Sequence, residues 1–258
     1  MAERRKSSHL ILVSLLIVML VVAVPGFALA KNAAAGLNPD TSFYVPKPNH
    51  GAKVQFAELM SSGSATDAWL IRAMISTPQA VWFEKGTPKT VEQEVRNTVK
   101  LAAAKRSVPV LVVYNIPFRD CAQFSAGGAT TMAEYLAWID GFAAGIGDEP
   151  AVVILEPDGL GIIPWYDPYG SDDGSDALEW CQPVEADPET AAAERFMMLN
   201  YAVDAIKAHP HASVYLDGTH SAWLGVGDAA QRLEQAGVGR ADGFYLNVSN
   251  YQFTANLE

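Results

Sequence analysis

Three apolar runs of the sequence lead into aspartates. Asp120 follows the run at 108–115, Asp158 follows the run at 151–156, and Asp217 ends the run at 213–217. If these runs are neighbouring parallel strands, their carboxyl ends meet at one edge of the sheet, where the side chains can lie close together. Two carboxylates held close repel each other when both are charged, which raises the pKa of one. Such a pair supplies one proton donor and one charged partner, as glycosidic cleavage requires.

A purely structural explanation competes with this one. Asp120 would pair with Arg119 or cap a turn, and Glu156-Pro157-Asp158 would be only a polar strand end. For one aspartate alone we favour that explanation. Three strand ends that all carry aspartate favour a site.

Aromatic side chains are the second ingredient. Sugar rings have apolar C–H faces and polar edges, so tryptophan beside carboxylates or amides suits them. Any single ring is more often part of a core, but Trp82 and Trp223 stand in polar or glycine-rich stretches. The other candidate rings are Phe83, Tyr114, Trp165, Tyr166, Trp180 and Tyr251.

The elements that would position these residues alternate along the chain. Dense apolar runs predict parallel strands at 68–75, 108–115, 151–156, 213–217 and 243–248. Three helix starts are predicted between them, at Thr90 with Gln93, at Thr131 with Glu134, and at Asp187 before Pro188. The alternation predicts an α/β domain with buried parallel strands, either a barrel or an open doubly wound sheet.

Composition and motifs exclude several classes of protein. Half of the 258 residues are apolar and 18% are charged, which excludes a disordered chain. Without residues 1–30 the chain has 15 basic and 28 acidic residues, a net charge of −13, so nucleic acid and anionic membrane are poor partners. No dinucleotide fingerprint, P-loop lysine pattern or G-x-S-x-G elbow is present in the sequence. His220 has no second histidine at ligand spacing, so we assign no metal and no cofactor.

The first thirty residues have the pattern of a targeting segment. Arg4, Arg5 and Lys6 precede the apolar run 10–24, and Ala28-Leu29-Ala30 offers a cleavage site. We expect residues 1–30 to be a signal peptide, 31–49 a short leader and 50–258 the folded domain of a secreted protein. The alternative is a membrane anchor through residues 10–24.

The sequence contains two cysteines, and an exported chain would meet an oxidising compartment. An even count in an exported chain favours one disulfide between Cys121 and Cys181. Two unpaired buried thiols are the alternative.

Four stretches, in this order, resemble the signature blocks of glycoside hydrolase family 6, the cellulases that cut β-1,4-glucans: "VYNIPFRDCAQFSAGG", "VVILEPDGLG", "YLDGTHSAWL" and "GFYLNVSNY". The resemblance extends from about residue 41 to the end. It implies a distorted (β/α) barrel with fewer strands than the usual eight, and hydrolysis with inversion of the anomeric centre. It identifies 50–258 as the N-terminal portion of the catalytic domain, with β-1,4-glucan as its partner and no protein partner implied.

The resemblance also implies roles for single residues. Asp158 would be the general acid, Asp120 the carboxylate that keeps it protonated, and Tyr114 the ring that presses on the distorted sugar. Asp217 would be a further acid of the cleft. The positions that hold glucose units in the family correspond to Trp82, His220, Trp223 and Asn250, with Asn247 as a weaker match. Cys121 and Cys181 match a family disulfide that ties the acid's loop to the segment around Asp120.

The sequence departs from the family pattern in three places. Gly159 stands where the family usually has Ser or Ala, and the acidic, aromatic stretch 159–180 is expected to form an extra lip on the cleft. The sequence ends at Glu258, before the family's last strands and the segment carrying the carboxylate usually proposed as base. We therefore expect a C-terminal truncation and place the base beyond Glu258.

These observations favour an exported, endo-acting β-1,4-glucanase. A carbohydrate-binding protein that kept the aromatic cleft and lost catalysis is the alternative, and it would bind sugar without turnover. A hydrolase of substrates other than sugars is a third hypothesis, but the nucleophile elbow that it would need is missing.

The solubility and activity of the 258-residue chain by itself can be predicted. A barrel without its closing strands exposes an unpaired strand edge and an apolar interior, so we expect the chain to be poorly soluble or nearly inactive. Soluble yield and hydrolysis of soluble cellulose are the measurements. Ready hydrolysis by this chain would contradict the prediction.

Overall fold

The computed structural model describes residues 37–166 and 181–257. Within them five parallel strands pair in sequential order, β1-β2-β3-β4-β5. Their bounds are Val81–Phe83 (β1), Val110–Val113 (β2), Ala151–Leu155 (β3), Ala212–Asp217 (β4) and Gly243–Tyr245 (β5). The predicted α/β fold with parallel strands is confirmed. In the described ranges β1 and β5 each have a single partner strand, so the sheet is not closed there.

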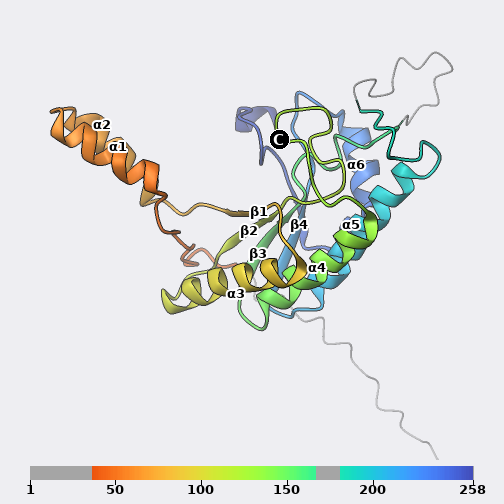
Figure 1. Cartoon of the computed structure of the whole chain (residues 1–258), viewed down its shortest axis with the longest axis horizontal. Coiled ribbons are helices and arrows are strands. Elements are labelled where there is room, and N and C mark those ends of the chain that lie inside the picture. Colours follow the sequence, from red (N-terminus) through yellow and green to blue (C-terminus); the bar gives the residue numbers. More distant parts are fainter. Residues whose placement is uncertain (1–36, 167–180, 258) are drawn as a thin grey trace, which may run out of the picture. The chain divides into compact units, whose positions relative to one another are not determined.

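Helices connect the consecutive strands. They are α3 (Pro88–Ala104), α4 (Met132–Ile146), α5 (Ala191–Lys207) and α6 (Val226–Gln235), with short 3-10 helices η1 (Val238–Arg240) before β5 and η2 (Thr254–Asn256) after it. Figure 1 shows α3, α4 and α5 side by side along the strands, and contacts join α3 to α4, α4 to α5 and α5 to β4. A doubly wound sheet reverses its strand order, and this one does not, so the winding is that of a barrel wall.

Alternation along the strands separates two apolar layers. In β2, Leu111 and Val113 belong to the large core shared with the helices. Val112 and Tyr114 point to the opposite face and pack with Ile154 of β3 in a second, smaller cluster. The face away from the helices therefore carries Tyr114, at the carboxyl end of β2.

The predicted strand at 68–75 is wrong, because these residues belong to a helix. Helices α1 (His50–Ser61) and α2 (Ala65–Ile75) precede the sheet and pack against each other. A short apolar run fits a buried strand or a helix equally well, and this one is rich in Ala, Leu, Met and Arg, which favour helices. The first strand is instead β1, whose three residues are too few to show a pattern in the sequence.

Two of the three predicted helix starts lie away from the observed ones. α3 begins after Thr87, whose side chain accepts the Thr90 N–H, with Pro88 in the first turn. α5 begins after Thr190, and Asp187 opens the turn before it by accepting the Thr190 and Ala191 N–H groups through its carbonyl. Thr131 caps α4 as predicted, by accepting the Glu134 N–H.

Some predictions fall outside the described residues. These are the signal peptide at 1–30, the anchor through 10–24, most of the lip at 159–180, and Trp180. Within the described ranges no helix combines the length and the apolar character of a membrane span. At the start of the described chain, the Tyr44 N–H donates to the Val108 carbonyl at 2.9 Å, which ties residues before 50 to the segment that enters β2.

Glycine lets α3 and α4 approach closely. A Cβ added at Gly145 would lie 2.7 Å from the Val95 Cβ, and one at Gly141 would lie 2.2 Å from the Pro88 carbonyl oxygen. Such distances are too short for real atoms, so the two main chains meet where these side chains are missing.

We predict opposite signs for two Gly→Ala substitutions in helices. Gly145→Ala should lower the free energy of unfolding by about 1–3 kcal/mol, because the methyl group overpacks the α3–α4 contact. Gly227→Ala in α6, where a Cβ would meet nothing within 4 Å, should raise it by about 0.5–1 kcal/mol. Urea unfolding measures both. Equal effects of the two variants would contradict the packing argument.

Candidate active site

A sharp turn after β3 positions Asp158. Glu156 and Asp158 have positive φ angles of 50° and 63°, with Pro157 between them. Residues other than glycine rarely adopt this conformation, and such outliers cluster at functional sites. The Asp158 N–H donates to the Asp217 carboxylate at 2.8 Å, and the Asp158 carbonyl accepts the Gly161 and Ile162 N–H groups at 2.9 Å. The turn is therefore held on both sides of Asp158.

The surroundings of the Asp158 carboxyl raise its pKa. Burial is the main cause that raises its pKa, and the negative charge of Asp120 adds to the rise. A 2.7 Å hydrogen bond from the Ser249 hydroxyl and the nearby charge of His220 act in the opposite direction. Repulsion from Asp120, the cause expected from the sequence, raises the pKa of Asp158 less than removal from water does.

Asp120 stands in the loop after β2, with a φ of 46°. One of its carboxylate oxygens accepts the Ser125 N–H, so the aspartate caps a turn of its own loop. Among the described residues no ion pair joins Asp120 to Arg119. The Arg119 guanidinium instead donates to the carbonyls of Glu84 and Ser125. The Asp120 carboxylate is thus free of a cationic partner in its loop.

Two aromatic rings lie beside these carboxylates. Trp82 of β1 meets Tyr114 edge to face, with ring centroids 5.4 Å apart, and 43% of Trp82 is exposed. The Arg119 guanidinium lies 4.7 Å above the Tyr114 ring. Burial raises the pKa of Tyr114, and the charges of Asp120 and Asp158 raise it further, so all three groups share one neighbourhood.

Asp217 ends β4 and is almost fully buried. Its Oδ2 atom accepts the N–H groups of Asp158 and Thr219 at 2.8 and 3.2 Å. Burial raises the pKa of Asp217 to about 7, and the charge of Asp158 contributes to the rise. The structure therefore places Asp217 under the Asp158 turn, as its support.

The other predicted binding residues occupy the loops after β4 and β5. The ring of Trp223 lies 5.7 Å from that of His220 and packs against the cluster that contains the two cysteines. Asn250 is half-buried in the loop after β5. The Asn247 amide is occupied by the main chain of Gln252, donating to its carbonyl at 3.1 Å and accepting its N–H at 2.9 Å.

Cys121 and Cys181 form a disulfide, as predicted, with Cα atoms 5.5 Å apart. Together with Ile162 they make a small apolar cluster, against which Phe118 and Trp223 pack. The disulfide therefore ties the loop of Asp120 to the chain that follows the loop of Asp158.

Sequence reasoning missed three residues of this edge. From the sequence, Glu156 is placed at the end of a strand, and Arg195 and Ser249 are assigned no role. The only sequence signal was the rarity of charge inside apolar stretches. It applies to Glu156 at the end of β3 and to Arg195 within α5.

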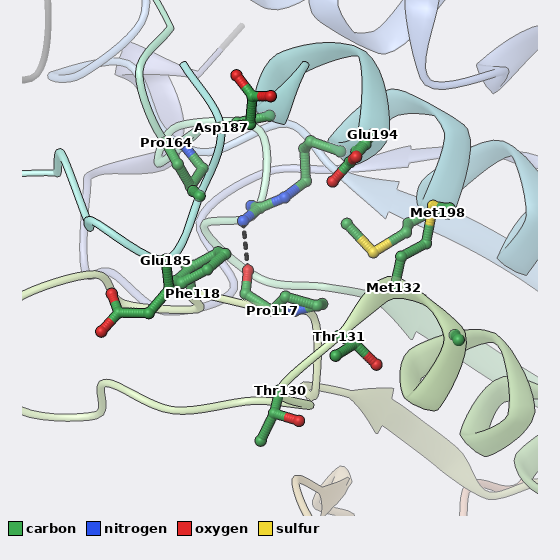
Figure 2. A pocket seen from close by; sticks show the side chains of 14 residues that line it. Pro117, Phe118, Thr130, Thr131, Met132, Pro164, Glu185, Asp187, Glu194 and Met198 are labelled. Carbon is green, nitrogen blue, oxygen red and sulfur yellow. Dashed lines mark hydrogen bonds between the residues drawn. The ribbon is translucent and has the colours of Figure 1, made fainter. Parts of the chain in front are cut away.

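One cavity lies between the loops that follow β2 and β3 and the first turns of α4 and α5. It measures about 340 Å³ and is lined by residues of the β2 and β3 loops and of α5, among them Pro117, Phe118, Pro164, Glu194 and Met198 (Figure 2). None of the predicted catalytic or sugar-binding residues lines it. Across 37–166 and 181–257, no group of His, Cys, Asp or Glu side chains could hold a metal ion.

The sequence of this chain matches one known family of proteins. The family model of Glycosyl hydrolases family 6 matches residues 38–258. The chain belongs to glycosyl hydrolase family 6. The resemblance seen in the four sequence blocks is thus confirmed over most of the chain.

Two of the relatives in family 6 are named endoglucanases and cover most of this chain. Endoglucanase A of Thermobispora bispora is 34% identical over 244 residues, which cover 92% of this chain and 48% of the relative. Endoglucanase 1 of Streptomyces sp. strain KSM-9 is 40% identical over 184 residues, which cover 70% and 45%. The chain thus spans about half the length of these two relatives.

Solved structures of family 6 members share the fold. The endoglucanase Cel6 from Mycobacterium tuberculosis, solved with methyl-cellobiosyl-4-deoxy-4-thio-β-D-cellobioside, matches with a TM-score of 0.67 and 34% identity, covering 88% of this chain and 67% of that one. A family 6 enzyme from Coprinopsis cinerea matches with a TM-score of 0.63 at 22% identity, over 82% and 59%. The second match bears on the fold alone.

The raised pKa of Asp217 predicts how stability depends on pH. The folded state binds the Asp217 proton more tightly than the unfolded state does, so its contribution is favourable at low pH and is lost as pH rises from about 4 to 7. Asp217→Asn cannot titrate. The free energy of unfolding of the Asp217→Asn variant minus that of the original chain should therefore be higher at pH 8 than at pH 5, by more than about 1 kcal/mol.

Urea unfolding at several pH values measures this difference, with Asp67→Asn on the exposed side of α2 as the matched control. The control should follow the curve of the original chain. If the curve for Asp217→Asn also runs parallel to it, the buried carboxyl does not titrate in this range.

Proposed function

We propose that this family 6 chain is the N-terminal portion of the catalytic domain of an exported, endo-acting β-1,4-glucanase. Its substrate would be cellulose or a related β-glucan, cleaved with inversion of the anomeric centre. Residues 1–30 would serve as the signal peptide, 31–49 as the leader and 50–258 as catalytic domain. The charge pattern of residues 1–30 supports export, and the endoglucanase names of the Thermobispora and Streptomyces relatives support endo action.

The observation that carries this proposal is the environment of Asp158. Its carboxyl is partly buried, has a raised pKa, and is held in a constrained turn at the carboxyl edge of the sheet, where barrel enzymes bind their substrates. A carboxyl whose pKa is raised holds its proton to higher pH than an exposed aspartate, and it can donate that proton to the oxygen that leaves when a glycosidic bond breaks. Asp158 would be that general acid.

The neighbours of Asp158 suit the other needs of the reaction. Positive charge develops on the sugar ring in the transition state, and the Asp120 carboxylate, without a cationic partner in its loop, would stabilise it. Tyr114 stays neutral because its pKa is raised, and it would press against the ring that is being distorted. Trp82 exposes an aromatic face beside Tyr114 on which a neighbouring glucose unit would stack.

The remaining predicted binding residues would hold the glucan on the other side of the acid. His220, Trp223 and Asn250 lie in the loops after β4 and β5, from which Ser249 also reaches Asp158. Asn247 would act indirectly, since its amide holds the Gln252 main chain and so shapes the loop that carries Asn250. Asp217 would act indirectly too, through the Asp158 turn.

Inversion requires a second carboxylate roughly 6.5–9.5 Å from the acid, with the attacking water between them. Asp120 accepts the Ser125 N–H of its own loop, and Asp217 accepts the N–H of Asp158 itself. We assign the base to neither of them. The proposal keeps it beyond Glu258.

Replacing the general acid tests the proposal. In the full-length gene product, Asp158→Asn should lower the rate of hydrolysis of soluble cellulose by about 10²–10⁴-fold, because an amide cannot donate the proton. Its affinity for cellulose should remain nearly intact. Rates are measured by release of reducing ends, and the anomer of the fresh product by proton NMR.

The control is Asp67→Asn in α2, which should keep the full rate. Unchanged turnover in Asp158→Asn would remove Asp158 from its role. Initial release of the β-anomer would overturn inversion, and cellulose binding without turnover by the unsubstituted protein would favour the carbohydrate-binding alternative.

A further inference from the structure

Two buried charged side chains lie between the loops that carry Asp120 and Asp158. Glu156 directly follows β3, and Arg195 stands in the second turn of α5. Each is 1% exposed. Neither has a part in the chemistry proposed above, although an isolated charge in a protein interior is costly.

Glu156 reaches from the end of β3 across to the end of β2. Its carboxylate accepts the Asn115 N–H at 3.0 Å and the Ile116 N–H at 3.1 Å. Its own N–H donates to the Val113 carbonyl at 2.9 Å, as the last link between the two strands. The side chain thus continues the pairing of β2 and β3 after the strands themselves have ended.

Arg195 joins the same two loops from below. Its guanidinium donates to the Gly159 and Ile162 carbonyls of the β3 loop, at 2.7 and 2.8 Å. It also donates to the Pro117 carbonyl of the β2 loop at 2.7 Å, a bond that Figure 2 draws as a dashed line. The Glu156 carboxylate therefore accepts hydrogen bonds from main-chain N–H groups, and the Arg195 guanidinium donates to main-chain carbonyl groups. Both side chains bridge the two loops.

The bridged main-chain atoms flank the two aspartates closely. Pro117 stands three residues before Asp120, while Glu156 and Gly159 enclose Asp158. Hydrogen bonds to ionised groups are stronger and more directional than those between neutral groups. An apolar pair of equal volume would fill the same space, but it would leave these five main-chain groups without their partners.

We propose that Glu156 and Arg195 are positioning residues that fix the separation of Asp120 and Asp158 and keep water from the Asp158 carboxyl. This inference rests on the proposed role of Asp158 as general acid. It extends that role by naming the two residues, distant from the sugar, on which the protonation of the acid depends.

The surroundings of both groups give the direction of the expected effect. Asp158 is faced by Asp120, His220, Ser249 and Tyr114, and its N–H by Asp217. Glu156 is faced by Tyr135 from α4 and by Arg195 from α5. Burial is the largest cause that raises the pKa of Asp158, so separation of the two loops would admit water, weaken the repulsion from Asp120 and lower that pKa.

Two substitutions test the inference in the full-length gene product. Glu156→Gln places an amide NH₂ against main-chain N–H groups, and Arg195→Lys cannot reach three carbonyls with one ammonium group. For both we expect the Asp158 carboxyl, followed by ¹³C NMR, to titrate at lower pH by about half a unit or more. The alkaline limb of the kcat profile should shift equally, with kcat lowered on the order of tenfold and KM little changed.

Asp242→Asn is the matched control. Asp242 directly precedes β5, at the opposite edge of the sheet, and its carboxylate likewise accepts a main-chain N–H of a neighbouring strand, that of Val214, at 2.8 Å. It also pairs with Lys207. This variant should lose stability while leaving the titration of Asp158 and the pH profile unchanged.

The titration separates this inference from the proposed function, because it needs no turnover. If either variant folds and Asp158 titrates as before, the positioning role is wrong, even where Asp158→Asn abolishes activity. If neither variant folds, the two side chains serve the fold itself and the specific role is likewise overturned. A shift of the Asp158 titration in an otherwise inactive protein would support the positioning role and count against the glucanase.

Discussion

A carboxylate as deeply buried as Glu156 needs hydrogen-bond donors for both of its oxygens, because an unpaired charge in the interior is unfavourable by several kcal/mol. It finds them in the main chain just after β2, where the strand has ended and its N–H groups have no strand partner. This requirement holds the ends of β2 and β3 together beyond their ladder. Asp120 and Asp158 both stand in the loops that follow those two ends.

The same edge shows why its residues adopt unfavourable conformations. Positive φ angles occur at Phe118, Asp120, Glu156, Asp158, Thr219 and Asn247, all of them in segments that follow strands. Each such residue costs about 1–3 kcal/mol and persists only where its surroundings hold it. The holding contacts are visible: Asp217 binds the Asp158 N–H, Ser125 binds Asp120, and Gln252 binds Asn247. The packing of the helices and the large core offsets the unfavourable free energy of these conformations.

Residues that directly follow a strand could be predicted from the sequence. Residues whose role depends on contacts between distant parts of the chain could not. Asp120, Asp158 and Asp217 were found because each follows a dense apolar run, and the disulfide was found because an exported chain with two cysteines favours pairing. The run at 68–75 was assigned to a strand because apolar density is common to buried strands and helices. Arg195 could not be found, since its partners lie 33 to 78 residues away and are main-chain carbonyls, which every residue has.

Burial rather than charge repulsion is the first cause of the raised pKa of Asp158, and this shifts attention to whatever excludes water. A Cβ at Gly161 would lie 2.6 Å from the Trp223 ring, so this ring lies directly on the loop that follows the acid. The disulfide and Ile162 support the same ring from beneath. A side chain first considered as a surface for sugar therefore also packs against the loop that follows the acid. Under the proposed function, a glucan stacked on Trp223 would cover this loop and exclude further water from the acid.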